Sequence, residues 1–394
     1  MDELTHYRAP FTIYVVWHPE NKAGKIYAEA MYNAFCRNLS SPLMRALGIP
    51  VFFRFAPLPD TGVPLPLDVG ESEYNAIVVL VEEQMTGDKI RWKPYIRELY
   101  QQSGGKSRLY PVAMDSFAMA FDPGQLNVSQ FINLIGEEEM EAGIQELRSR
   151  LLHDFARLLY GIESVNEVDD LNTSPPVTLF ISHAKVDGER LAIDFRDYIN
   201  THSKLKTFFD ANDIRDASDF AKAIRTNVKN SAVVVFLSDQ YTTREWCLIE
   251  VIVAKRNKSP LVVVNNLQKG ERRSFPYLGN VPTMRYREGC FSEIVDLALY
   301  QALNNLYFQL KLNKEIELYQ LSKKYRTYAI QNAPELFTYI DIKRITDELT
   351  AANDLKPVLV IYPDPPLGAE ELKVLNDIDP HIDFITPSLF HTLN

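Results

Sequence analysis

The sequence predicts an α/β protein built from two larger domains and a smaller carboxyl-terminal segment. Short apolar runs alternate with segments of helical periodicity, the pattern of parallel strands joined by crossover helices. The alternation occurs twice, and a polar stretch at 162–176 separates the two series. A chain of 394 residues is also long for a single core, so more than one domain is expected.

The first series predicts a domain over residues 1–165. Its strands are predicted where apolar runs of strand length occur, at 11–17, 49–55, 75–81 and 108–114. Its helices are predicted at 24–39, 94–100 and 136–161, and the last of these has acidic residues at its start and Gly161 at its end. The linker that follows, 166–176, is rich in Asp, Asn and Pro and has no periodicity.

The second series predicts a domain over residues 177–312. Its strands are predicted at 177–182, 205–210, 231–238 and 260–266, and its helices at 187–202, 219–230, 244–256 and 291–312. The remaining residues, 313–394, are predicted to be helical up to about residue 352 and to end in one β-α-β unit. Because one such unit cannot bury both faces of its strands, we expect it to dock on one of the larger sheets.

Composition and charge argue against several classes of function. A net charge of -10 is unfavourable for a broad nucleic-acid surface, so direct nucleic-acid binding is not expected. No stretch of about 18 apolar residues occurs, which predicts that the chain does not cross a membrane. Cys36, Cys247 and Cys290 show no C-x-x-C spacing, so neither a zinc site nor a disulfide framework is predicted. These features predict a cytoplasmic protein without a bound metal.

One carboxylate in the second series lies in an apolar environment. From Leu248 to Ala254 every residue except Glu250 is apolar, and the segment predicts a largely buried helix. A buried carboxylate costs several kcal/mol unless it is paired, neutralised or opened to a wet site. An ion pair with Arg244 or Lys255 is one alternative, a surface position is another, and a functional cleft is the third.

Four motifs in residues 177–256 resemble those of the Toll/interleukin-1 receptor (TIR) domain family, in the order and spacing of the family. LFISHAKVDG resembles its first box, and FFDANDIRDASDF resembles its second strand with the BB loop. SAVVVFLSDQYTTREWCLIEV resembles its fourth strand through the S-x-W-C-x-x-E-L motif. Within that stretch Trp246 and Glu250 form a W-x-x-x-E pair. The resemblance implies a flavodoxin-like parallel sheet and does not extend to residues 1–165 or 320–394.

The resemblance also implies an activity. Many TIR domains cleave NAD at the nicotinamide–ribose bond, and the catalytic glutamate of the W-x-x-x-E pair corresponds to Glu250. Nicotinamide is already a cationic leaving group, so positive charge develops on the ribose C1 and a fixed carboxylate stabilises it. NAD is then the substrate, and no cofactor is expected. Trp246 falls on the same helical face as Glu250 and is expected to wall the cleft.

The ends of the other strands supply further substrate-binding candidates, since ligands of open α/β sheets bind beyond the carboxyl ends of the strands. Phe180, Ser182 and His183 match the first-box positions of the family, beside nicotinamide and ribose. Asp210 and Ser238 end the next two strands. The sequence departs from the family at His183, where a tyrosine is common.

The BB loop, residues 211–220, is expected to mediate self-association, because TIR active sites are commonly completed or opened by neighbouring TIR domains. Asp213 matches its acidic edge. Ile214 and Phe220 are apolar side chains in an otherwise charged loop, as expected of contact anchors. Ala217 occupies the position of the loop glycine of the family, and alanine does not favour positive φ as glycine does.

The first domain resembles the second in one stretch. NAIVVLVEEQMTGDKIRW is similar in character to SAVVVFLSDQYTTREW, which matches Trp92 with Trp246. The residue four places after Trp92 is Ile96 rather than a carboxylate. We therefore expect a degenerate TIR-like or related flavodoxin-like domain without catalysis, and an unrelated α/β domain is the alternative.

Three functions are compatible with these residues. The first is an NAD-cleaving TIR enzyme, a prokaryotic defence or signalling effector that is activated by assembly. The second is a TIR adaptor that only binds other TIR domains, and the third is a nucleotide-sensing α/β protein with a TIR output. Retention of both Trp246 and Glu250 favours the enzyme, because scaffolding needs neither residue.

Overall fold

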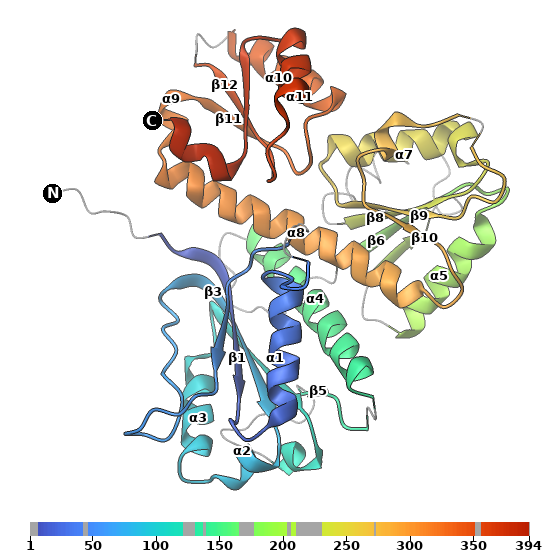
Figure 1. Cartoon of the computed structure of the whole chain (residues 1–394). Helices are drawn as coiled ribbons and strands as arrows, with labels where there is room; N and C mark the ends of the chain where they lie inside the picture. Colours follow the sequence, from blue (N-terminus) through green and yellow to red (C-terminus); the bar gives the residue numbers. More distant parts are fainter. Residues whose placement is uncertain are drawn as a thin grey trace. The chain divides into compact units, whose positions relative to one another are not determined.

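The computed structural model describes residues 7–41, 46–120, 131–136, 139–164, 177–202, 206–209, 231–271, 273–350 and 356–393. The chain divides into two compact units (Figure 1). The described part of the first unit ends at Asp154, and the second unit contains residues 155–164 and everything described from 177 onward. The long helix α4 (Met140–Ser164) therefore begins in one unit and ends in the other. The predicted linker, 166–176, lies outside the described residues.

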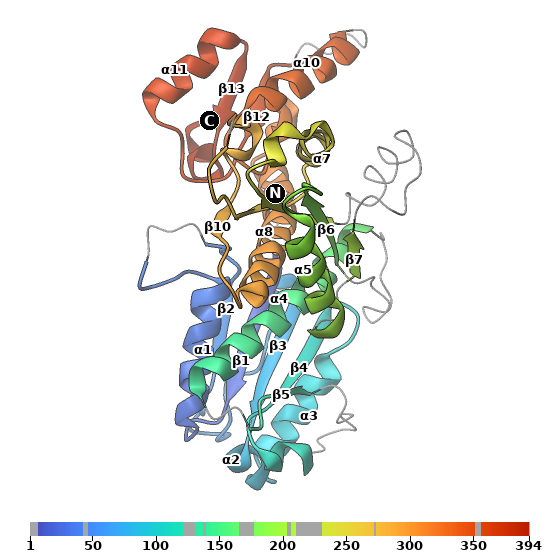
Figure 2. The same cartoon turned by 90° about the vertical axis from the view of Figure 1, so that its right-hand side faces the viewer.

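The first unit holds a five-stranded parallel sheet in the order β2-β1-β3-β4-β5 (Figure 2). Its strands are β1 (Ala9–Trp17), β2 (Val51–Arg54), β3 (Ser72–Val81), β4 (Ser107–Ala113) and β5 (Ile132–Asn133). Before α4 it has helices α1 (Lys22–Phe35), α2 (Glu83–Gly87), α3 (Trp92–Gln102) and the 3-10 turn η1 (Ser116–Ala120). The central strands β1 and β3 are almost entirely buried, which is why the sequence shows them as continuous apolar runs.

The second unit holds another five-stranded parallel sheet, in the order β10-β9-β8-β6-β7. Its strands are β6 (Thr178–His183), β7 (Lys206–Phe209), β8 (Ser231–Leu237), β9 (Leu261–Asn265) and β10 (Thr283–Arg285). Its helical elements are α5 (Glu189–His202), η5 (Tyr241–Thr243), α7 (Glu245–Arg256), η6 (Pro276–Leu278) and α8 (Phe291–Leu318). Counted along the chain, both sheets have the order 2-1-3-4-5 of flavodoxin-like folds. The predicted α/β class is confirmed; the helix predicted at 219–230 lies outside the described residues.

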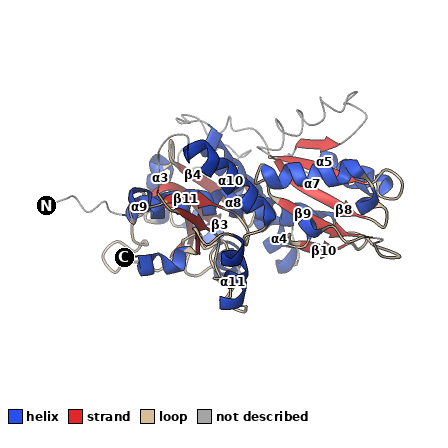
Figure 3. Ribbon diagram, turned by 90° about the horizontal axis from the view of Figure 1, so that it is seen from above, coloured by secondary structure: helices blue, strands red, loops and turns tan. Residues whose placement is uncertain are grey.

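The two faces of the second sheet are covered by different helices. Side chains alternate along β8, so Val233 and Val235 point to one face, where they pack with Val251 of α7. Figure 3 shows α7 beside the strands of this sheet. Phe236 points to the other face, and its ring lies 5.3 Å from the ring of Phe195 in α5. Helix α8 packs against β8 and β9. The position of α7 on the first of these faces brings its side chains close to the ends of the central strands.

The carboxyl-terminal segment differs from the prediction. Strands β11 (Arg326–Ala329), β12 (Val358–Ile361) and β13 (Ile382–Ile385) form a third parallel sheet in that order, so the expected docking of one β-α-β unit on a larger sheet is wrong. Strand β11 lies inside the stretch predicted to be helical. Its four residues, RTYA, are only half-buried and form no apolar run, which explains why no strand was expected there.

Helix α8 links the second and third sheets. It extends to Leu318 rather than to residue 312, and Leu312 packs in one core with Leu359, Ile361 and Phe390. The remaining elements around this sheet are α9 (Leu321–Lys324), α10 (Leu336–Thr350), α11 (Ala369–Ile378) and η7 (Pro387–Leu393). One helix thus contributes to the cores on both sheets.

Three further findings concern the predicted classes of function. No helix among the described residues is long and apolar enough to span a membrane. The three cysteines are all free thiols. The described part of the chain contains no group of three or more His, Cys, Asp or Glu side chains that could hold a metal ion.

Candidate active site

The carboxyl ends of β6 and β8 meet where the strand order reverses in the second sheet. Ser182 and His183 end β6, Ser238 follows β8, and all three side chains are buried. Asp187, in the loop after β6, connects the two ends. Its carboxylate accepts hydrogen bonds from Ser238 Oγ at 2.6 Å and from the Gln240 N–H at 2.9 Å. Three predicted site residues therefore lie at one edge of the sheet.

Glu250 lies beside this edge, because α7 packs on the adjoining face of the sheet. Its side chain is 2 % exposed, and the Ser182 hydroxyl donates a hydrogen bond to Glu250 Oε2. The Tyr241 hydroxyl lies 2.6 Å from Ser182 Oγ and 3.3 Å from the Cys247 carbonyl oxygen. A strand, a turn and a helix each contribute one member of this buried group, which we call the Ser182–Tyr241–Glu250 cluster.

Burial also controls the protonation of two groups at this edge. It raises the pKa of Tyr241 well above the usual range, and the neighbouring Glu250 raises it further, so Tyr241 remains a neutral hydroxyl. Burial lowers the pKa of His183 below its usual value of 6.5, so this imidazole is neutral at neutral pH. Neither side chain places a charge next to Glu250.

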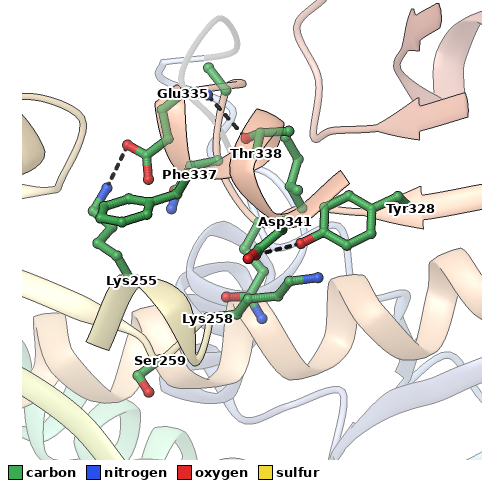
Figure 4. Close-up of a pocket in the computed structure, with 12 residues that line it drawn as sticks. Lys255, Lys258, Ser259, Tyr328, Glu335, Phe337, Thr338 and Asp341 are labelled. Carbon is green, nitrogen blue, oxygen red and sulfur yellow. Dashed lines mark hydrogen bonds and ion pairs between the residues drawn. The ribbon is translucent and has the colours of Figure 1, made fainter. Parts of the chain in front are cut away.

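The structure contradicts a surface position for Glu250 and one of its two considered ion-pair partners, Lys255. The Glu250 side chain is buried, so it is not a surface glutamate. Lys255 is not its ion-pair partner either, because Lys255 Nζ lies 3.0 Å from Glu335 Oε2 (Figure 4). The Lys255 side chain is only 6 % exposed, so its ion pair with Glu335, the residue before α10, is shielded from solvent on the lysine side. The cationic end of α7 is therefore bound to the third sheet and its helices.

A second, partly buried lysine supports the same end of α7, beside a cavity of about 50 Å³. Lys258 Nζ donates to the Ala329 carbonyl oxygen at 2.7 Å and lies 4.1 Å from the centroid of the Tyr328 ring. Lys258 has a φ of 56°, the left-handed conformation that glycine usually provides after a helix. The Tyr328 hydroxyl donates in turn to Asp341 Oδ2 at 2.8 Å (Figure 4). These contacts fix the carboxyl end of the helix that carries Glu250.

Two predicted substrate residues have different environments. Trp246 is 50 % exposed, while Phe180 is 1 % exposed and packs in the core between the sheet and α7. The prediction of a largely buried helix holds for the middle of α7, where no residue from 248 to 254 is exposed. The fully buried residues are Cys247, Glu250, Val251 and Ala254, and the exposed ones lie at the two ends of the helix. Apolar residues surround most of this helix, but only one side of it faces the sheet.

The five remaining predicted residues lie outside the described residues: Asp210, Asp213, Ile214, Ala217 and Phe220. Two residues of the site were not predicted, Tyr241 and Asp187. Both lie within stretches that carry recognisable motifs, three residues after Ser238 and five after Ser182. Their positions were visible in the sequence, whereas their hydrogen-bond partners are set by the packing of separate segments.

Comparison with known proteins identifies the region that contains the cluster. The sequence model of one family, described as the TIR domain, matches residues 179–289. A search of curated proteins gives no match. Among solved structures, the crystal structure of tagatose-6-phosphate ketose/aldose isomerase from Escherichia coli shares 13 % identity, and the match covers 77 % of this chain and 83 % of that chain with a TM-score of 0.21. A TM-score this low supports no conclusion about this chain.

Proposed function

Residues 179–289 form a TIR domain, and on this basis we propose that the chain is an NAD nucleosidase that cleaves the nicotinamide–ribose bond with Glu250 as the catalytic carboxylate. The observation that carries the proposal is the buried Ser182–Tyr241–Glu250 cluster beside the point where the strand order reverses. The first sheet supports this interpretation, because the corresponding helix there has Ile96, which is 0 % exposed. A carboxylate is therefore not a requirement of this type of fold.

The proposed reaction converts NAD and water into nicotinamide, ADP-ribose and a proton. The bond from ribose C1 to the nicotinamide nitrogen breaks, its electron pair leaves with nicotinamide, and positive charge develops on C1. An ionised Glu250 stabilises that charge, most strongly in a site with little water. Water then bonds to C1 and releases its proton. Attack by an adenine nitrogen in place of water would close a cyclic ADP-ribose.

Ser182 and Tyr241 position the carboxylate in this proposal. The Ser182 hydroxyl donates to Glu250 Oε2, which restricts rotation of the carboxylate and orients it for the ribose. Tyr241, held neutral by its raised pKa, braces Ser182 from the other side. His183 and Ser238 lie at the same edge and would contact the substrate.

The burial of Glu250 leads us to include activation by assembly in the proposal. A side chain that is 2 % exposed must become accessible before a ribose can lie against it. Contact with a neighbouring TIR domain would provide that change, and the 50 % exposed Trp246 is the type of residue that anchors such contacts. An enzyme that is closed until it assembles suits a prokaryotic defence or signalling effector, acting in the cytoplasm on cellular NAD.

The same burial favours a second candidate, a TIR adaptor that binds other TIR domains without catalysis. An adaptor needs no access to Glu250, and the exposed Trp246 would still serve as a contact. The two candidates differ in one measurable property, the release of nicotinamide.

The deciding experiment measures nicotinamide release from NAD by the purified full chain over a series of protein concentrations, with sedimentation velocity in parallel. We expect specific activity to rise as the chain associates. Full activity from a monomer at every concentration would remove assembly from the proposal. An associated chain that releases no nicotinamide would leave the adaptor.

A further inference from the structure

The first sheet has a hollow of ligand size at the place that corresponds to the candidate active site of the second. Strands β1 and β3 end at Trp17 and Val81, and the strand order reverses between them. An open surface hollow of about 510 Å³ lies beyond these ends, lined by the loop after β1 and by residues between 84 and 91 after β3. Small-molecule sites are typically about 300–1,000 Å³ and favour such reversal points. Both the position and the size of this hollow are therefore typical of a ligand-binding site.

Two cationic side chains line the part of the hollow that follows β3. Among the described residues, no carboxylate pairs with the exposed Lys89 ammonium. Arg91 is oriented by Asp88, whose Oδ2 accepts from Arg91 Nε at 2.8 Å while its Oδ1 accepts from the Arg91 backbone N–H at 2.9 Å. That ion pair uses the Nε atom of Arg91, so the terminal nitrogens of the guanidinium remain as donors. Lys89 and Arg91 together suit a phosphate group.

The opposite part of the lining comes from the loop after β1 and provides an imidazole ring and a carboxylate instead of cations. His18 Nδ1 accepts from the Glu20 N–H at 3.3 Å, which places the proton of the neutral ring on Nε2. The His18 ring is braced by Trp92, 5.1 Å away between centroids. Glu20 supplies a carboxylate that accepts hydrogen bonds from hydroxyl groups. Ile90, also part of the lining, is 87 % exposed and offers an apolar surface.

We propose that the first unit binds a nucleotide in this hollow. The phosphate lies at Lys89 and Arg91, the ribose hydroxyls donate to Glu20, and the base lies against Ile90 and the His18 ring. The unit binds the nucleotide without cleaving it, because the residue that corresponds to Glu250 is the buried Ile96. This assignment concerns a separate site and holds whether or not the TIR domain cleaves NAD.

The test is calorimetric titration of the full chain with AMP, GMP, CMP and UMP, each compared with its nucleoside and with inorganic phosphate. At least one monophosphate binds, and its nucleoside binds about tenfold more weakly or worse, because the nucleoside lacks the charged group. Inorganic phosphate alone also binds more weakly than the nucleotide. Absence of binding for all four monophosphates up to ~1 mM overturns the proposal.

Three variants locate the binding. Lys89→Glu weakens the nucleotide about tenfold or more, whereas Lys25→Glu, the same charge change on the exposed face of α1, leaves the affinity unchanged. Gly87→Phe fills the hollow and abolishes binding. A side chain is tolerated at this position, since a Cβ there meets nothing within 4 Å and the backbone is not left-handed. Affinity that survives in both Lys89→Glu and Gly87→Phe places the nucleotide elsewhere and refutes the site.

Discussion

The two five-stranded sheets have the same strand order and polarity, but the first unit buries both members of one helical pair of residues, whereas the second buries only the second member of the corresponding pair. In the first unit Trp92 is 1 % exposed and Ile96, four residues later, is 0 % exposed. In the second unit Trp246 is 50 % exposed, and Glu250, four residues later, is 2 % exposed. Both pairs lie at the start of the helix that follows the third strand of the sheet, α3 and α7.

This difference separates the requirements of the fold from those of the proposed chemistry. In the first unit both residues belong to one apolar core, together with Tyr95 and Leu99. In the second unit the aromatic Trp246 is half exposed to solvent. The carboxylate of Glu250 is instead buried and accepts a hydrogen bond from Ser182. A buried carboxylate is unfavourable for folding, and the proposed catalytic role gives a reason for its presence. The predictions below test this contrast.

The largest effect is expected for Ile96→Glu in the first unit. This variant places a carboxylate at the position that corresponds to Glu250, without a Ser182–Tyr241 pair to receive it. It should lower the free energy of unfolding by about 3–5 kcal/mol, because the charge is buried without a partner. Urea unfolding measures the loss. Ile90→Glu is the control, since Ile90 is 87 % exposed and should change stability by less than about 0.5 kcal/mol. Equal losses in the two variants would contradict the comparison.

The next effect is expected for Glu250→Gln in the TIR domain. The two side chains have nearly the same shape, so the fold should persist while nicotinamide release from NAD falls about 100- to 1,000-fold. Glu245→Gln, an exposed position on the same helix, should retain wild-type turnover. Retained turnover in a folded Glu250→Gln protein would exclude Glu250 from the mechanism.

A smaller but direct contrast is expected between the two tryptophans. Trp92→Ala should lower the free energy of unfolding by about 3–5 kcal/mol, because it empties a core position. Trp246→Ala should cost about 1 kcal/mol, because half of its side chain is already in contact with solvent. Thermal and urea unfolding of the two single variants supply the comparison. If Trp246→Ala also abolishes turnover at this small stability cost, Trp246 acts in binding or assembly rather than in packing.

The smallest effect concerns pH. Because the folded pKa of His183 is depressed below 6.5, the unfolded state binds more protons than the folded state between that depressed pKa and about 6.5. Stability from this group is therefore lost as pH falls through that window. Urea unfolding at about pH 7.5 and about pH 5.5 should show a larger acid loss for wild type than for His183→Gln. His202→Gln, at an exposed histidine, should keep the wild-type acid loss, and identical behaviour of all three proteins would remove His183 as its source.

The sequence by itself determined the longer strands, most of the helices and the identity of the buried carboxylate, whereas the short strands β5, β10 and β11 were not predicted. The strands of parallel sheets are buried on both faces, so runs such as 75–81 and 231–238 are continuous apolar segments that local pattern identifies. The apolar surroundings of Glu250 are equally local, because they follow from the neighbouring residues on one helix. Strand β11 was not predicted, because its four residues are only half-buried and form no continuous apolar run in the sequence.

The tertiary structure alone decided which of these residues meet. Tyr241 and Ser182 are 59 positions apart and Lys255 and Glu335 are 80 apart, and no local periodicity relates either pair. The tertiary structure also decided that Trp246 is half exposed, although its spacing from Glu250 is the same as that of Trp92 from Ile96. Spacing along a helix fixes only the direction of a side chain relative to its neighbours. The environment that it meets depends on which surfaces of sheet and helix pack together, and distant segments of the chain provide those surfaces.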